Sequence, residues 1–111
     1  MTAAQQARVE GFLAALAHRG IALELLPDGT PVTALVEPAE PDQGEFALAR
    51  ETAAASRIHV LRSHLEGLTL GHGRVLREVE SRATHRVIAI ADSPVSVAVV
   101  FTCETAAEVA P

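Results

Sequence analysis

Histidines are the residues of this chain best suited to hold a metal ion, and their spacing argues against one. They stand at His18, His59, His64, His72 and His85. No two are separated by the three or four residues that place two imidazoles on one helical face, and none forms a His-x-His pair on a strand. The glycines form no phosphate-cradling pattern either. We therefore expect no metal ion and no cofactor.

Cys103 and His85 come closest to a nucleophile with its base. A one-residue change of register would move them to opposite faces of a sheet, and a lone cysteine packs more often as a small apolar residue. Glu78 and Glu80 would share one side of a strand, as paired carboxylates do, but arginines surround them and a solvated charged face is the ordinary interpretation. We predict no catalytic residues and no enzymatic activity.

Length and composition are typical of one small soluble domain. The chain has 111 residues, which suits a single domain over 1–111. It has no apolar run long enough to cross a bilayer and no basic start followed by an apolar stretch. Its single cysteine rules out an internal disulfide and agrees with a reducing compartment. We expect a soluble, non-secreted protein with no membrane partner.

Charge is divided unevenly along the chain. The net charge of −5 argues against nucleic acid as the main partner. All nine basic residues are arginines, and six of them lie in the second half, whereas acids crowd the middle. This division suits either a solvated surface or complementary charge between neighbouring copies or partner proteins. The candidate assembly-interface residues are Glu40, Asp42, Glu45, Phe46, Glu51, Arg57, Arg62, Arg74, Arg77 and Arg86.

One helix is predicted at the start of the chain, over about 2–19. Thr2 and Gln5 have the spacing of a capping box, and apolar residues recur at helical spacing from Val9 to Leu16. Gly20 is expected to end the helix in a left-handed conformation. The apolar stripe is narrow, so one side should pack while the other meets solvent or a partner.

Strands account for most of the remaining chain. They are predicted at about 21–26, 31–37, 57–62, 74–80, 84–91 and 95–103. Pro27-Asp28-Gly29-Thr30 should turn the first strand into the second. A long acidic loop is predicted over 38–56, with a possible short strand from Phe46 to Ala49, and a single capped turn over 63–67.

The last two predicted strands form a hairpin that is apolar on both faces. Ile88 and Ile90 would share one face of its first strand, opposite Val87, Ala89 and Ala91. A strand buried on one face alternates more cleanly. We therefore predict a mainly β fold, a small antiparallel sandwich or barrel with one N-terminal helix. Either this fold buries both faces of the hairpin, or the next subunit covers an apolar face that stays exposed.

In its order of elements the chain resembles the head-tail joining proteins of tailed phages, the lambda-type stopper or tail-attachment family. Leu65, Leu68 and Gly71 match the family pattern xxLxxLxxGD, and Arg86-Val87 match the strand that follows it. The resemblance spans nearly the whole chain as a pattern. It implies a small β fold with one helix, assembled as a ring.

The chain departs from that family pattern in three places. His72 stands where Asp is common, His85 stands where an aromatic residue is common, and a longer stretch, 79–83, replaces a tight turn. These differences concern the subfamily more than the fold.

As a function, the resemblance implies a structural protein of the virion, made in the host cytoplasm and located in the phage neck. It would form a homo-oligomeric ring, a hexamer, between the portal-side adaptor and the tail or terminator proteins, with DNA passing nearby in the channel. A tail terminator ring is the alternative within phages. A small intracellular binding or immunity-type module is the alternative from another class.

Overall fold

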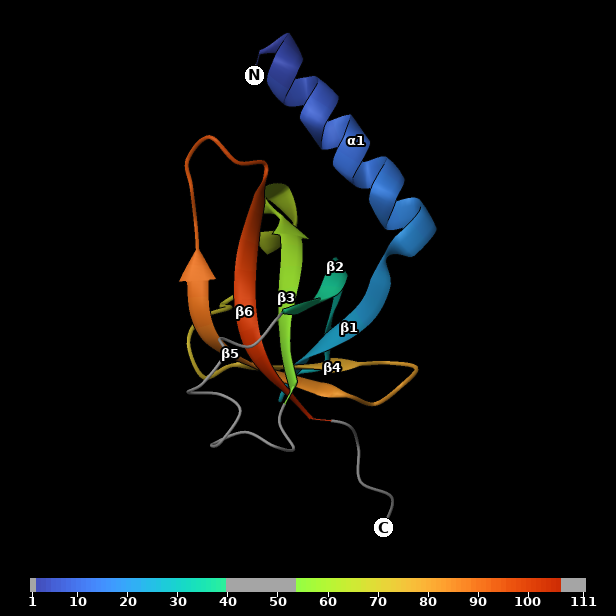
Figure 1. Ribbon diagram of the computed structural model, residues 1–111, viewed down its shortest axis with the longest axis vertical. Helices are drawn as coiled ribbons and strands as arrows, with labels where there is room; N and C mark the ends of the chain where they lie inside the picture. The colour runs from blue at the N-terminus through green and yellow to red at the C-terminus, as the bar shows by residue number, and fades with distance from the viewer. Residues whose placement is uncertain (1, 40–53, 107–111) are drawn as a thin grey trace.

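Six antiparallel strands and one helix make up the part of the chain that the computed structural model describes, residues 2–39 and 54–106. The strands close into a barrel in the order β1–β2–β3–β6–β5–β4, and α1 rises away from it (Figure 1). The predicted small β barrel with one N-terminal helix is confirmed. The elements are α1 Ala3–Arg19, β1 Ile21–Leu26, β2 Thr30–Ala39, β3 Ala54–Leu61, the 3-10 turn η1 Arg62–Leu65, β4 Val75–Glu78, β5 Thr84–Ala91 and β6 Ala98–Ala106.

Helix α1 begins with the predicted capping box. The Thr2 side chain accepts a hydrogen bond from the Gln5 backbone at 3.1 Å, and the Gln5 side chain accepts one from the Thr2 backbone at 3.0 Å. These two bonds satisfy amide groups that the first helical turn leaves free. No residue of the helix is buried, and its apolar stripe is only half-covered.

Gly20 does not adopt the left-handed conformation that the sequence predicts. Its backbone is extended, with φ −65° and ψ 141°, because the chain passes directly from α1 into β1. Glycine is still required, since a Cβ atom there would collide with the carbonyl oxygen of Leu16. The predicted turn at Gly29 is confirmed, with a positive φ of 79°.

Aliphatic side chains from every strand fill the barrel, as the alternating pattern of the strands requires. Phe101 is the largest of them and the only aromatic residue in the core cluster. Each fully buried Val, Leu, Ile or Phe side chain stabilises the fold by about 1.5–3 kcal/mol. The cluster consists of Leu23, Leu25, Val32, Ala34, Ile58, Val60, Leu76, Val87, Val99, Phe101 and Cys103.

The predicted loop over 38–56 is too long at both ends. Strand β2 continues to Ala39, and β3 already begins at Ala54, with Pro38 opposite Ser56. Proline is tolerated here because β2 is an edge strand at this level, with no described strand on its other side. The rest of the predicted loop, 40–53, lies outside the described residues, as does its short strand.

Strand β6 starts at Ala98, three residues later than predicted, because Arg62 holds the preceding segment as a loop. The Arg62 guanidinium donates to the carbonyl oxygens of Ser93 at 2.7 Å and Ser96 at 3.2 Å, and pairs with Asp92 at 2.8 Å. Three other predictions are also wrong: β6 continues to Ala106 instead of ending at 103, β4 covers only 75–78, and the turn after β3 has no side-chain cap.

A bulge in β5 changes which residues share a face. Val87 lies opposite Cys103 and Ile90 lies opposite Phe101, with a register shift between Val87 and Ala89. Val87 and Ile90 are therefore on the core side, and the predicted grouping of Val87 with Ala89 is wrong. A bulge inserts one residue and so reverses the alternation beyond it.

The barrel closes over only part of the length of its strands. β1 pairs with β2 as far as Ala34, and beyond that point β2 pairs with β3 alone. β4 pairs with β5 as far as Arg86, and beyond the bulge β5 pairs with β6 alone. Staggered strands of this kind are a property of barrels. We call the region where only β2, β3, β6 and β5 are paired the open sheet, and the opposite end the closed end.

Candidate functional sites

A buried polar network at the closed end joins four strands. The His85 ring lies 2.7 Å from a Glu78 carboxylate oxygen through Nε2, and 2.7 Å from the Thr105 hydroxyl through Nδ1. The Thr105 hydroxyl in turn donates to Ser56 at 2.8 Å. Glu78 ends β4, His85 begins β5, Thr105 lies near the end of β6 and Ser56 near the start of β3.

The order hydroxyl, imidazole, carboxylate is the one that nucleophile, base and orienting acid adopt in hydrolases. Here, however, the His85 side chain is 1% exposed and both of its nitrogens are engaged within the network. Its hydrogen bonds therefore satisfy groups that would otherwise be buried without partners. The geometry fits a network that fixes the register of four strands at the closed end.

Two sequence interpretations change at this network. Glu78 and Glu80 were expected to share a solvated face, but Glu78 bonds the buried His85 whereas Glu80 is exposed in the following turn. Cys103 and His85 are both buried, yet the Cys103 thiol interacts with the Phe101 carbonyl oxygen at 3.6 Å and not with the imidazole. Burial raises the pKa of the Cys103 thiol to about 12, so the reactive thiolate is scarce.

Three of the arginines proposed for the assembly surface are engaged in ion pairs within the fold. Arg62 holds Asp92 and the loop before β6. Arg77 bonds Glu24 across the β1–β4 pair, with its Nε 2.7 Å from the carboxylate. Arg86 pairs with Glu104 at 2.6 Å. Each pairing reduces the charge available to a partner.

The other two proposed arginines differ from these and from each other. Arg74 is half-buried, donates to the Leu26 carbonyl oxygen at 3.1 Å, and leaves its Nε buried without a partner in the described structure. Arg57 is exposed on the outer face of β3 opposite Glu37, and after His59 its charge also contributes to the lowered pKa of the Glu37 carboxyl. The remaining candidates lie outside the described residues, and they are Glu40, Asp42, Glu45, Phe46 and Glu51.

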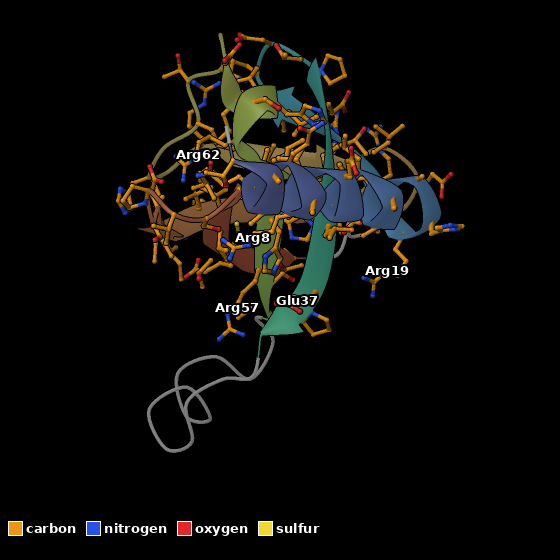
Figure 2. All side chains as sticks on the ribbon, turned by 90° about the horizontal axis from the view of Figure 1, so that it is seen from above. Arg8, Arg19, Glu37, Arg57 and Arg62 are labelled. Carbon is orange, nitrogen blue, oxygen red and sulfur yellow. The ribbon has the colours of Figure 1, made fainter. Side chains whose placement is uncertain are left out.

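Unpaired basic groups gather on one side of α1. Figure 2 shows Arg8 and Arg19 along one side of the helix, with Arg57 and Glu37 on that same side and Arg62 on the other. Arg8, Arg19 and Arg57 have no hydrogen bond or ion pair to any residue that the structure describes. Sequence reasoning named Arg57 but missed Arg8 and Arg19, although their separation of 11 residues is three helical turns and is itself the signal.

A hollow of about 230 Å³ lies where α1 ends beside β2. Arg19, Leu35, Val36, Glu37 and His59 line it. The Glu37 carboxylate and the His59 Nε2 are 2.8 Å apart across it. The hydrogen bond from His59 is the main cause that holds the pKa of the Glu37 carboxyl below its ordinary value. The arrangement places one carboxylate and one unpaired guanidinium at the edge of the open sheet.

A larger groove, of about 410 Å³, separates the first half of α1 from the top of the barrel. Its lining is mainly apolar, with Val9 from the helix facing Leu61, Val95 and Val97. Val95 is 70% exposed, and Leu13 farther along the helix is 43% exposed. An apolar groove with open walls is the kind of surface that other proteins cover. Sequence reasoning anticipated a helix face for a partner, but not this groove.

No protein-family model and no curated protein matches the chain. Within the described residues, no group of three or more His, Cys, Asp or Glu side chains is placed to hold a metal ion. None of the described helices is long and apolar enough to span a membrane.

Proposed function

We propose that the chain is a structural protein of the neck of a tailed phage, a head-tail joining or stopper subunit. It forms a homo-oligomeric, six-fold ring between the portal-side adaptor and the tail. The proposal begins from the resemblance carried by Leu65, Leu68, Gly71 and Arg86-Val87. The small barrel with one leading helix agrees with the fold that this resemblance implies.

The uncovered helix is the observation that supports the proposal most strongly. A 17-residue helix in a small domain normally buries its apolar stripe, because packing supplies most of its stability. Here α1 has no buried residue, and an apolar groove remains open beneath its first half. A helix held this way has surface left for a neighbouring subunit.

The distribution of charge also supports a contact between α1 and a neighbouring subunit. The unpaired Arg8, Arg19 and Arg57 share one side, whereas four acids stand between residues 40 and 51. Opposite charges on neighbouring surfaces steer association and set its register. Contacts between copies, or with an acidic surface of the adaptor, would use these guanidinium groups.

Electron microscopy of the chain mixed with its portal-side adaptor tests the proposal. We expect added density with six-fold symmetry directly against the adaptor. Density at the end of the tail tube would identify a tail terminator instead. A compact complex of one copy with one unrelated soluble protein, and no ring, would support a binding or immunity-type module and contradict the proposal.

A matched pair of helix variants tests the supporting observation. Leu13→Glu places a charge on the exposed apolar stripe, and we expect it to lower ring occupancy on the adaptor while the melting temperature stays within a few degrees. Ala7→Glu adds the same charge on the other side of the helix and should leave occupancy unchanged. Equal effects of the two variants would show that the apolar stripe is not a contact surface.

A further inference from the structure

We infer that the open sheet continues from one copy of this chain into the next, with the outer edge of β5 in one copy pairing with the outer edge of β2 in its neighbour. The β5 edge is Ala89–Ala91 and the β2 edge is Leu35–Glu37, the residues that share rows across the open sheet. This inference rests on the proposed ring and names its interface. The occupant of each edge is therefore a second copy of the chain.

Both edges lack a described strand on their outer side. The outer side of β2 becomes open after Ala34, where β1 gives way to α1. The outer side of β5 becomes open after Val87, whose backbone still bonds Gly73 and Arg74 just before the start of β4. An open edge presents unpaired backbone N–H and C=O groups, which another strand satisfies by adding to the sheet.

The two edges lie at the same level of one sheet. Glu37 is opposite Arg57, Arg57 is opposite Thr102, and Thr102 is opposite Ala89. One continuous row of paired residues therefore runs from the β2 edge to the β5 edge. Figure 1 shows the ends of these two strands on opposite sides of β3 and β6.

Strand direction makes the two edges complementary. All three pairings across the open sheet are antiparallel, so β5 runs antiparallel to β2 of the same copy. A second copy related by rotation about an axis along the strands therefore brings its β2 beside β5 in antiparallel orientation. Such a contact joins two different surfaces, and repeating it leaves no open edge once the ring closes.

Side chains on the next row match as well. Val36 is opposite Ile58, Ile58 is opposite Phe101, and Phe101 is opposite Ile90. Val36 packs against the core at one end of this row, whereas Ile90 at the other end is 36% exposed. Continuing the sheet places Ile90 beside Val36 of the next copy and so covers it.

A hollow lies next to the β2 edge, between the end of α1 and the face of the β2–β3 pair. The hollow of about 230 Å³ beside Arg19 lies along Leu35, Val36 and Glu37. On the β5 edge, the residues that flank Ile90 are Ala89 and Ala91, which are small and exposed. Small side chains at an edge allow another backbone to approach.

Paired cysteines test this interface directly. Glu37→Cys and Ala89→Cys are combined in one chain, and the protein is oxidised on the adaptor and alone at high concentration. Neighbouring strands place opposite Cα atoms about 4.5–5.5 Å apart, within the range of a disulfide. We expect a ladder of covalent oligomers that ends at the ring. A short bis-maleimide, applied in parallel, captures pairs shifted by two rows, the smallest shift that keeps both side chains on the same face.

The controls separate this contact from others. The native Cys103 is buried, so the unmodified chain should give no cross-link. Glu37→Cys alone and Ala89→Cys alone should also give none, because each needs the other edge. A double variant with Asp28→Cys, in the β1–β2 turn, and Ala89→Cys should give no ladder of covalent oligomers. A covalent dimer of either single variant would show that two β2 edges, or two β5 edges, pair with each other, and this would overturn the inference.

A charge variant provides a second measurement. Ile90→Lys places an ammonium group where the next copy must pack, and we expect at least about a tenfold loss of ring formation. Val79→Lys changes another exposed apolar residue, which lies across β1 from Thr33 and on neither edge, and should form rings normally. A six-fold ring that forms without the Glu37–Ala89 cross-links, or that tolerates Ile90→Lys, overturns the edge pairing and leaves the proposed function standing. Absence of any ring overturns both.

Discussion

The closed end and the open sheet of this barrel use the same strands in different ways. At the closed end β4 bridges β1 and β5, and the network of Glu78, His85, Thr105 and Ser56 satisfies polar groups in the interior. In the open sheet two strand edges lack described partners, and Ile88 and Ile90 are exposed. The difference separates the part that holds the monomer together from the part that the proposed ring would use.

Truncation of the core should give the largest loss of stability. Phe101→Ala removes a side chain that is 2% exposed and leaves a cavity among aliphatic neighbours. We expect the free energy of unfolding to fall by about 3–5 kcal/mol. Urea denaturation followed by circular dichroism measures this loss. A loss below about 1 kcal/mol would show that the barrel interior tolerates a void at this position.

Disruption of the polar network should give the next largest loss of stability. Glu78→Ala leaves the buried Nε2 of His85 without its partner, and we expect the free energy of unfolding to fall by about 1–3 kcal/mol. Glu80→Ala, two residues away in an exposed turn, is the matched control and should change stability by less than about 0.5 kcal/mol. Equal losses of stability in the two variants would show that Glu78 contributes no more to the fold than an exposed glutamate does.

Truncation at the open edge should cost the monomer little. Ile90 lies opposite Phe101 on the same row, but its side chain is already partly in water. We expect Ile90→Ala to lower monomer stability by less than about 1 kcal/mol, because less apolar area leaves the interior. The same denaturation experiment compares it with Phe101→Ala. A loss as large as that of Phe101→Ala would mean that the edge belongs to the core.

The Glu37–His59 pair should have the smallest effect. The lowered pKa of the Glu37 carboxyl means that the pair stabilises the folded state above the ordinary pKa of glutamate, and that this contribution is lost as the pH falls through the lowered value. We expect Glu37→Gln to remove a weak acid-side dependence of the melting temperature. Both side chains are near the surface, so salt should reduce the effect. An unchanged pH profile in Glu37→Gln would contradict this assignment.

Local sequence patterns predicted the elements well where a few neighbouring residues decide the outcome. The spacing of Thr2 and Gln5 predicted the start of α1, and the turn sequence Pro27-Asp28-Gly29-Thr30 predicted the first hairpin. Errors occurred where a distant contact intervenes. The extended backbone of Gly20 depends on β1 following the helix, and the late start of β6 depends on Arg62.

The candidate sites were harder to predict than the fold. The charged residues were visible in the sequence, but their partners were not: the ion pairs of Arg77 with Glu24 and of Arg86 with Glu104, two arginines predicted for an interface, were not anticipated. Conversely, Arg8 and Arg19 were not named, although they have no partner in the described part of the chain. Exposure depends on which strands pair, and pairing is not a local property.

By itself, the sequence determined a mainly β domain with one capped helix, because capping residues, turn residues and alternation act over a few positions of the chain. Only the tertiary structure decided that the barrel closes at one end and stays open at the other. That outcome depends on the stagger of the strands and on the bulge after Val87, which turns Ile90 toward the core side. Stagger and bulges arise when distant segments pair, and no short stretch of residues specifies them.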